Sequence, residues 1–177
     1  MDSVVLGGGC FWCLEAVFLR VRGVVGVVSG YANGQTEAPT YEQVCSGRSG
    51  HAEVVEVRFD PQQLSLDEVL MVFFAMHDPT TLNRQGNDVG TQYRSGVYTH
   101  SDAQAQAVRA FMATMPHDAH WENREVVTEV QALSKLWPAE QYHQTYFDRN
   151  PQQGYCAYII APKVQKLMRD FTEYLAR

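Results

Sequence analysis

The chain has 177 residues, of which 45% are hydrophobic and 19% are charged, so it is long enough to bury one continuous core as a single domain. Its formal net charge of −6 argues against nucleic acid or an anionic membrane as a main partner, because both require a clustered basic surface. It shows no signal-peptide pattern and no run of about 20 apolar residues, so we expect a soluble, cytoplasmic protein without a membrane span.

The first predicted elements are a short strand and a helix that are joined by three glycines. Ser3–Leu6 is an apolar run of strand type, and a helix is predicted over Cys13–Arg20. Gly7–Gly9 deliver Cys10 to the helix N-terminus, where backbone N–H groups are unpaired and the dipole is positive. Such a position favours a thiolate, since a free cysteine titrates near ~8.5 and falls by one to several units there. The alternative is a buried structural cysteine beside two aromatic residues.

Four elements with the periodicity or capping signals of regular structure follow the first helix. They are a strand over Val24–Tyr31, a helical turn over Tyr41–Cys45, a strand over His51–Phe59 and a helix from Leu66 to about Met76, opened by a capping box at Ser65. The polar stretch His77–Thr91 comes next. A loop of this length is usually functional or disordered.

Glu53 is the second candidate for chemistry. Alternate side chains of a strand share a face, which puts Glu53 with Val55, Val57 and Phe59. A carboxyl group on an apolar face has its charged form disfavoured, so its pKa rises and it stays protonated near neutral pH. We therefore identify Glu53 as a candidate proton donor. The alternative is a carboxylate that pairs with Arg or Lys, or that lies at a wet strand end.

The second half of the chain alternates between strand and helix signals. The predicted elements are a strand over Tyr93–Tyr98, a helix from about Ser101 to Met115, a strand over Val126–Val130, a helix over Ala139–Arg149 and a C-terminal helix over Lys163–Leu175. Through residue 99 the order is β-α-β-β-α-β, the ferredoxin-like arrangement. We therefore predict an α+β fold with this core, additional helices and a long C-terminal arm.

Cys156 follows Gly154-Tyr155 in a segment whose glycine and proline predict a mobile loop, which suits a resolving thiol. The alternative is an inert cysteine that enters a strand. Four tyrosines beside loops are candidates to orient a polar oxygen: Tyr31, Tyr41, Tyr93 and Tyr155. A zinc site normally shows two close ligand pairs, and the sequence has only the pair Cys10 and Cys13, so we expect no metal.

The sequence resembles the peptide methionine sulfoxide reductase A family over nearly its whole length. The motifs that carry the resemblance are, in order, Gly9-Cys10-Phe11-Trp12, Gly30-Tyr31, Pro39-Thr40-Tyr41, Gly50-His51-Ala52-Glu53, His77-Asp78-Pro79, Arg84-Gln85-Gly86-Asn87-Asp88, Gly90-Thr91-Gln92-Tyr93-Arg94-Ser95, Ala139-Glu140, His143-Gln144 and Gly154-Tyr155-Cys156. Taken together and in this order, these motifs are highly specific.

The resemblance implies a single catalytic domain, residues 1–177, that reduces the S epimer of methionine sulfoxide, free or in oxidised proteins, without metal or cofactor. The implied roles are nucleophile for Cys10, walls of the S-methyl pocket for Phe11 and Trp12, binding of the sulfoxide oxygen for Glu53, Tyr41 and Tyr93, and organisation of substrate and sulfur chemistry for Asp88. The oxidised nucleophile is a sulfenic acid, which a second thiol converts to a disulfide that thioredoxin reduces.

The identity of the second thiol is open. Many relatives carry glycine at the position of Cys13, whereas this chain has both Cys13 and Cys156. We favour Cys156 because it matches the family's C-terminal resolving position. Cys13 would otherwise resolve Cys10 directly or accept the disulfide in a second exchange.

Two other functions fit part of the sequence. A general dithiol–disulfide oxidoreductase would use the spacing of Cys10 and Cys13, although the strand order fits it poorly. A non-enzymatic peptide-binding module would use the aromatic pocket to recognise methionine.

Overall fold

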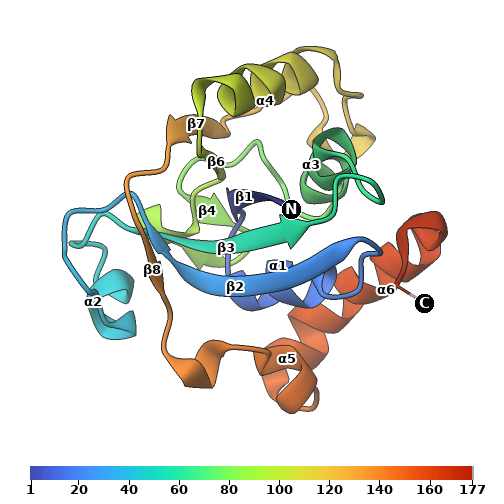
Figure 1. Ribbon diagram of the computed structural model, residues 1–177. Coiled ribbons are helices and arrows are strands. Elements are labelled where there is room, and N and C mark those ends of the chain that lie inside the picture. The colour runs from blue at the N-terminus through green and yellow to red at the C-terminus, as the bar shows by residue number, and fades with distance from the viewer. Residues whose placement is uncertain (177) are drawn as a thin grey trace.

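The computed structural model describes residues 1–176, in which a six-stranded sheet and a two-stranded hairpin are combined with helices (Figure 1). The strands are β1 (Asp2–Gly7), β2 (Val24–Ala32), β3 (Ala52–Phe59), β4 (Arg84–Gln85), β5 (Asp88–Val89), β6 (Gly96–Thr99), β7 (Glu129–Ala132) and β8 (Leu136–Pro138). The helices are α1 (Phe11–Phe18), α2 (Tyr41–Cys45), α3 (Leu66–Ala75), α4 (Asp102–Thr114), α5 (Tyr146–Arg149) and α6 (Ala161–Asp170). Within these residues no helix has the length and apolar character that crossing a membrane requires.

The large sheet has the order β7-β6-β1-β3-β2-β8. β1 and β2 each pair antiparallel with β3, and β1 also pairs antiparallel with β6. In this register Gly7 lies opposite Gly96, and Tyr31 lies opposite Glu53. The C-terminal ends of β1 and β2 therefore lie beside the N-terminal ends of β3 and β6, at one end of the strands.

The main hydrophobic core lies on one face of this sheet. Strand residues Val4, Leu6, Val57 and Phe59 belong to it, together with buried residues of α1, α3, α4 and α6. Figure 1 shows α6 (red) beside α1 (blue), and the two helices are in contact. The other face carries a smaller cluster: Val5, Ala32, Ala52, Val54 and Tyr98.

Helix α1 begins two residues before the prediction. Cys10 is extended at the N-cap position, and the backbone N–H of Cys13 donates to the Cys10 carbonyl oxygen at 3.1 Å. The predicted capping box of α3 is confirmed, because Ser65 Oγ accepts from the N–H of Glu68 and the Glu68 carboxylate accepts from the N–H of Ser65.

The strand predicted over Tyr93–Tyr98 is wrong in its first half. Thr91–Tyr93 form a 3₁₀ turn, and β6 begins only at Gly96. The reason is that β1 ends at Gly7, opposite Gly96, so β1 offers the backbone before Gly96 nothing to pair with. The preceding polar stretch contains the hairpin β4–β5, and the chain adds a short edge strand, β8; neither was predicted.

The helix predicted over Ala139–Arg149 is also wrong. A 3₁₀ turn and the short α5 are separated by Thr145, which is left-handed at φ 52°. The side chain of Gln144 accepts from the N–H of Ser29 at 3.1 Å and donates to the Ser29 carbonyl oxygen at 3.0 Å. This segment therefore satisfies backbone groups of β2, and a continuous helix is excluded.

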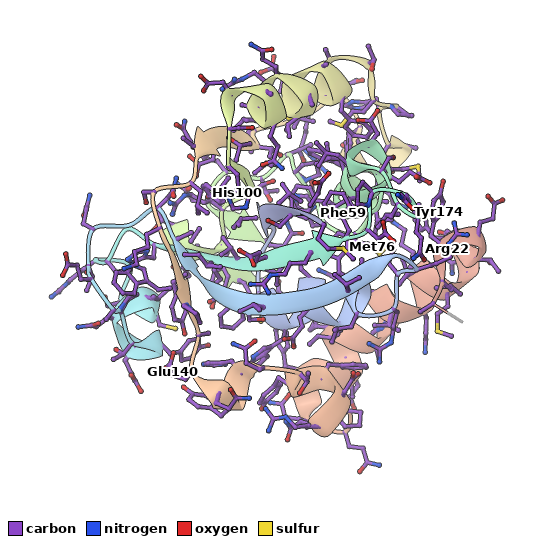
Figure 2. All side chains as sticks on the ribbon, in the orientation of Figure 1. Arg22, Phe59, Met76, His100, Glu140 and Tyr174 are labelled. Atoms are coloured by element: carbon purple, nitrogen blue, oxygen red, sulfur yellow. The ribbon has the colours of Figure 1, made fainter. Side chains whose placement is uncertain are left out.

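The C-terminal segment differs from its prediction in the same way. Cys156–Ile160 form a π-helical turn that runs into α6, where a mobile loop or a strand was expected. The predicted helix ends early because the chain after it pairs with the backbone of residues 20–22. The N–H of Arg22 donates to the Tyr174 carbonyl oxygen at 2.6 Å, and Figure 2 shows these two residues side by side.

Candidate active site

Cys10 lies at this end of the strands, where the chain turns from β1 into α1. Its side chain is 8% exposed and faces a cavity of about 200 Å³. The other lining residues come from the β4–β5 hairpin and the C-terminal segment: Gln85, Gly86, Asn87, Asp88, Tyr155, Ile159 and Lys163. The polar stretch that was predicted to be functional or disordered is therefore ordered and forms one wall of this cavity.

Two glycines before Cys10 leave room for side chains that cover the turn. A Cβ atom at Gly8 would lie 3.1 Å from the His77 ring. Gly9 has φ +95°, and a Cβ atom there would lie 2.7 Å from the Gln85 side chain. The close approach of the hairpin fixes the position of Cys10.

Glu53 is buried at the start of β3, next to the N-terminus of α1. One carboxyl oxygen, Oε1, accepts from the N–H of Phe11 at 3.2 Å. The other, Oε2, is buried and has no hydrogen-bond partner within residues 1–176. Burial, reinforced by the negative charge of Asp88 and Cys13, raises the pKa of Glu53 to about 8, although the Phe11 N–H opposes the shift. The predicted burial on the apolar face is confirmed, and the group holds a proton at neutral pH.

The two thiols of α1 differ in their titration. Burial, hydrogen bonding with Cys13 and the nearby Glu53 raise the pKa of Cys10. The pKa of Cys13 falls to about 7, chiefly through hydrogen bonding with Cys10, with help from Lys163 and Tyr155. The sequence predicted a lowered pKa at Cys10, but burial outweighs the helix N-terminus, and Cys13 is the more acidic of the two thiols.

A hydrogen-bonded chain connects Cys13 to the hairpin. Tyr155 Oη lies 3.9 Å from Cys13 Sγ and donates to Asp88 Oδ2 at 2.6 Å. Cys156, the next residue, is fully buried, and burial together with the charge of Cys13 raises its pKa. The three cysteines that were predicted to react are therefore brought to one region. Each is a free thiol.

Phe11 and Trp12 are held by the segment between β8 and α5. Trp12 Nε1 donates to Nδ1 of His143 at 3.1 Å, and its ring stacks on Tyr146 with 3.8 Å between centroids. Phe11 lies 5.1 Å from the His143 ring and 5.7 Å from the Tyr31 ring. Among the described residues neither aromatic side chain of this pair lines the cavity at Cys10.

The tyrosines divide into two groups. Tyr41 and Tyr93 are half-buried, and burial together with the charge of Glu53 raises the pKa of both phenols. Tyr31 instead donates to the Glu140 carboxylate at 2.8 Å, and the other oxygen of that carboxylate accepts from the Tyr41 N–H at 3.1 Å. Tyr31 thus serves to hold the helical turn that carries Tyr41.

The sequence analysis assigned no role to two residues of this region. His143 supports both aromatic rings, and Lys163 lines the Cys10 cavity. His143 belongs to a family motif, but its role comes from tertiary contacts, and Lys163 lies in no motif; both are more than 100 positions from Cys10 along the chain. Within residues 1–176 no three His, Cys, Asp or Glu side chains are grouped so that they could hold a metal ion.

Two interacting thiols next to a carboxyl group that retains its proton define a cysteine-dependent oxidoreductase. Comparison with known proteins identifies the family. The family model described as "Peptide methionine sulfoxide reductase" matches residues 2–175. The chain belongs to this family.

Individual relatives agree with this assignment. "Peptide methionine sulfoxide reductase MsrA" from Trichodesmium erythraeum (strain IMS101) is 53% identical over 176 residues, 99% of each chain. The solved structure of methionine sulfoxide reductase A of Corynebacterium diphtheriae superposes with a TM-score of 0.81 at 39% identity, over 89% of this chain and 78% of that one. Mxr1 from Saccharomyces cerevisiae in complex with Trx2 gives a TM-score of 0.57 at 26% identity, over 82% and 84% of the two chains.

Proposed function

We propose that this chain reduces the S-sulfoxide of methionine, free or in oxidised proteins, to methionine at Cys10. The observation that carries the proposal is the Glu53 carboxyl group, buried beside the Cys10 turn with Oε2 unpartnered within residues 1–176. Removal of a sulfoxide oxygen needs a nucleophile at sulfur and a proton at oxygen, and a buried acid with a pKa of about 8 holds that proton at neutral pH. Membership of the family supports the same reaction.

In the first step Cys10 attacks the sulfoxide sulfur and Glu53 transfers its proton to the oxygen. The Cys10 thiol proton passes to the Cys13 thiolate, so the negative charge moves from Cys13 to Glu53 and the total charge is unchanged. The hydroxyl group then passes from the substrate sulfur to Cys10 Sγ as the S–O bond and the bond between the two sulfurs break, so methionine leaves and Cys10 becomes a sulfenic acid. The sulfur of the substrate is reduced by two electrons, and Cys10 is oxidised by two.

The other site residues keep the roles that the resemblance implies. Tyr41 and Tyr93 donate to the sulfoxide oxygen, which is consistent with phenols that stay protonated near Glu53. We assign the walls of the S-methyl space to Phe11 and Trp12, which lie outside the lining of the cavity at Cys10 and whose rings are held by His143 and Tyr146. Asp88 organises the sulfur chemistry through its bond to the Tyr155 hydroxyl, next to Cys13.

Two disulfides follow in sequence. Cys13 condenses with the sulfenic acid of Cys10 and water leaves, because Cys13 lies one helical turn after Cys10 and is the more acidic thiol. Cys156 then attacks Cys13, which frees Cys10. The sequence favours Cys156 as the direct partner of Cys10. In this structure Cys156 is buried in a helical turn, which would first have to open.

Thioredoxin is the proposed reductant of the last disulfide. The yeast relative that was solved in complex with Trx2 supports this assignment. The exchange consumes the two thiols of the reductant and restores the two thiols of the enzyme. The cytoplasm, where thiols are kept reduced, is the compartment that suits such a cycle.

For the fold, we propose one catalytic domain over residues 1–177 with a ferredoxin-like core. The order β6-β1-β3-β2, with antiparallel neighbours, supports it. A single main hydrophobic cluster that includes residues of α1, α3, α4 and α6 supports one domain. The segment after β8 is the C-terminal arm in this description.

The test is turnover of separated methionine sulfoxide epimers with dithiothreitol. The S epimer should be consumed and the R epimer left unchanged. Glu53→Ala should lose this activity but keep thiol exchange with a small disulfide. Equal loss of both activities, or equal use of both epimers, would contradict the proposal. A general dithiol–disulfide oxidoreductase would instead keep both activities in Glu53→Ala.

The disulfide order is tested by mass analysis after one turnover of Cys13→Ser and Cys156→Ser proteins. We expect Cys156→Ser to close the Cys10–Cys13 bond at the wild-type rate. Rapid closure of a Cys10–Cys156 bond in Cys13→Ser would contradict this order and favour Cys156 as the direct partner.

A further inference from the structure

A second cavity adjoins the one at Cys10. Its volume is about 240 Å³. Its lining residues come from the end of α3, the β4–β5 hairpin, the segment after α4 and α6: Ala75, Met76, His77, Asp78, Gln85, Asp118, His120, Trp121, Lys163 and Lys166. Gln85 and Lys163 line both cavities and therefore form the wall between them.

The Gln85 part of this wall is fixed. Its Oε1 accepts from the N–H of Asp78 at 2.9 Å, and its Nε2 donates to the Asp78 carbonyl oxygen at 2.9 Å. Lys163 differs, because it extends from α6 as a half-buried side chain that has neither a hydrogen bond nor an ion pair within residues 1–176. A cation in that situation is available to a ligand that occupies the cavities.

The other charges around the second cavity have partners. Asp78 pairs with Arg124 at 3.4 Å, and Asp118 Oδ1 accepts from the backbone N–H of His120 at 2.8 Å. The ammonium group of Lys166 donates to the Ala75 carbonyl oxygen at 2.8 Å. In the first cavity the Asp88 carboxylate accepts from the Tyr155 hydroxyl. Lys163 acts on Cys13 only through its charge, so it is the charged group of these walls that makes no hydrogen bond or ion pair in the described part of the chain.

We propose that the second cavity is a subsite for an acidic residue, glutamate in particular, that neighbours methionine sulfoxide in a peptide or protein substrate. Lys163 binds its carboxylate, and Ala75, Met76 and Trp121 contact its methylene groups. Neighbouring Cα atoms are about 3.8 Å apart, so a residue next to the one held at Cys10 reaches the adjoining cavity. The inference rests on the proposed function, since it requires methionine sulfoxide at Cys10.

The experiment compares four blocked dipeptides, in which glutamate or glutamine precedes or follows methionine sulfoxide. A charge-assisted hydrogen bond at a half-buried site predicts about a tenfold higher kcat/KM for one glutamate peptide than for its glutamine counterpart, through KM. Lys163→Gln should reduce this ratio to about one, and Lys163→Arg should retain most of it. Lys135→Gln is the matched control, because Lys135 lies over the Trp137 ring beside β8 and lines neither cavity.

Because the kcat/KM values of the glutamate and glutamine peptides are compared within one protein, any effect of Lys163 on the reactivity of the thiols cancels. A wild-type ratio of one, or a ratio that survives in Lys163→Gln, would overturn the subsite. If Lys163→Gln does not reduce the peptides, inhibition constants replace kcat/KM. The reduced glutamate and glutamine peptides then serve as inhibitors, and the ratio of their inhibition constants is compared between the wild-type and Lys163→Met proteins. Failure of the wild type to reduce any of the four peptides would overturn the proposed function, and the subsite with it.

Discussion

Replacing Glu53 by Gln is expected to stabilise the fold while it removes activity. The pKa of Glu53 is about 8 in the folded protein, against an ordinary value of 4.5. Between these values the folded state holds a proton that the unfolded state has released, so the stability of the wild type falls as pH rises. The favourable contribution of Glu53 to the free energy of unfolding is complete below pH 4.5 and is lost by the time pH passes about 8. A glutamine of the same size does not titrate and still accepts from the Phe11 N–H.

The size of the effect follows from the pKa shift. Each pH unit in this window costs the wild type about 1.4 kcal/mol, so from about pH 5 to about pH 7.5 it loses on the order of 3 kcal/mol relative to Glu53→Gln. Urea unfolding of both proteins, fully reduced, at the two pH values gives the difference. All other titrating groups are shared and cancel. Glu37→Gln, which removes an exposed carboxylate from the loop after β2, is the control and should show no such change.

The same substitution tests the proton donor. General acid catalysis is worth about 10²- to 10⁴-fold, so Glu53→Gln should lose at least about 100-fold in kcat. The wild-type rate should fall as pH rises through about 8, where the donor loses its proton. Equal stability differences at the two pH values would mean that Glu53 is ionised in the folded protein, and the assignment of the proton donor would be refuted.

Three further substitutions test other parts of the structure. Gly9→Ala places a methyl group against Gln85 at a left-handed position, and should cost about 1–3 kcal/mol in urea unfolding and lower kcat/KM. Tyr155→Phe removes a hydrogen bond that lowers the pKa of Cys13, so the pH dependence of alkylation of this thiol should move upward; an unchanged curve would contradict the contact. Ser65→Ala breaks the α3 capping box and should cost about 1 kcal/mol with activity unchanged.

Local patterns predict the centre of the site well. Three glycines between a strand and a helix locate Cys10, and the alternation of β3 locates Glu53 on the buried face. Both features depend on neighbours within a few residues along the chain. The pKa of Cys10 does not, because burial under the hairpin and the proximity of Glu53 decide its direction.

Long-range contacts explain what the sequence could not predict. The chain around Gln144 has the composition of a helix, but its side chain amide is used by the backbone of Ser29. The segment after Phe171 likewise pairs with the backbone near Arg22. Helix propensity is a weak guide where a segment has to hydrogen-bond backbone groups of a distant strand or turn.

Burial of the site affects which of its groups hold protons before the reaction. It raises the pKa of both Glu53 and Cys10, so the nucleophile and the acid begin the reaction protonated. Cys13 is the more acidic thiol, because Cys10, Lys163 and Tyr155 lower its pKa. An exposed thiolate would react with many electrophiles, whereas in the proposed mechanism Cys10 loses its proton only when an adjacent oxygen takes one from Glu53. That mechanism couples nucleophilic attack to a substrate whose oxygen can be protonated, and it keeps the charge of the site constant, which avoids the cost of a new buried ion.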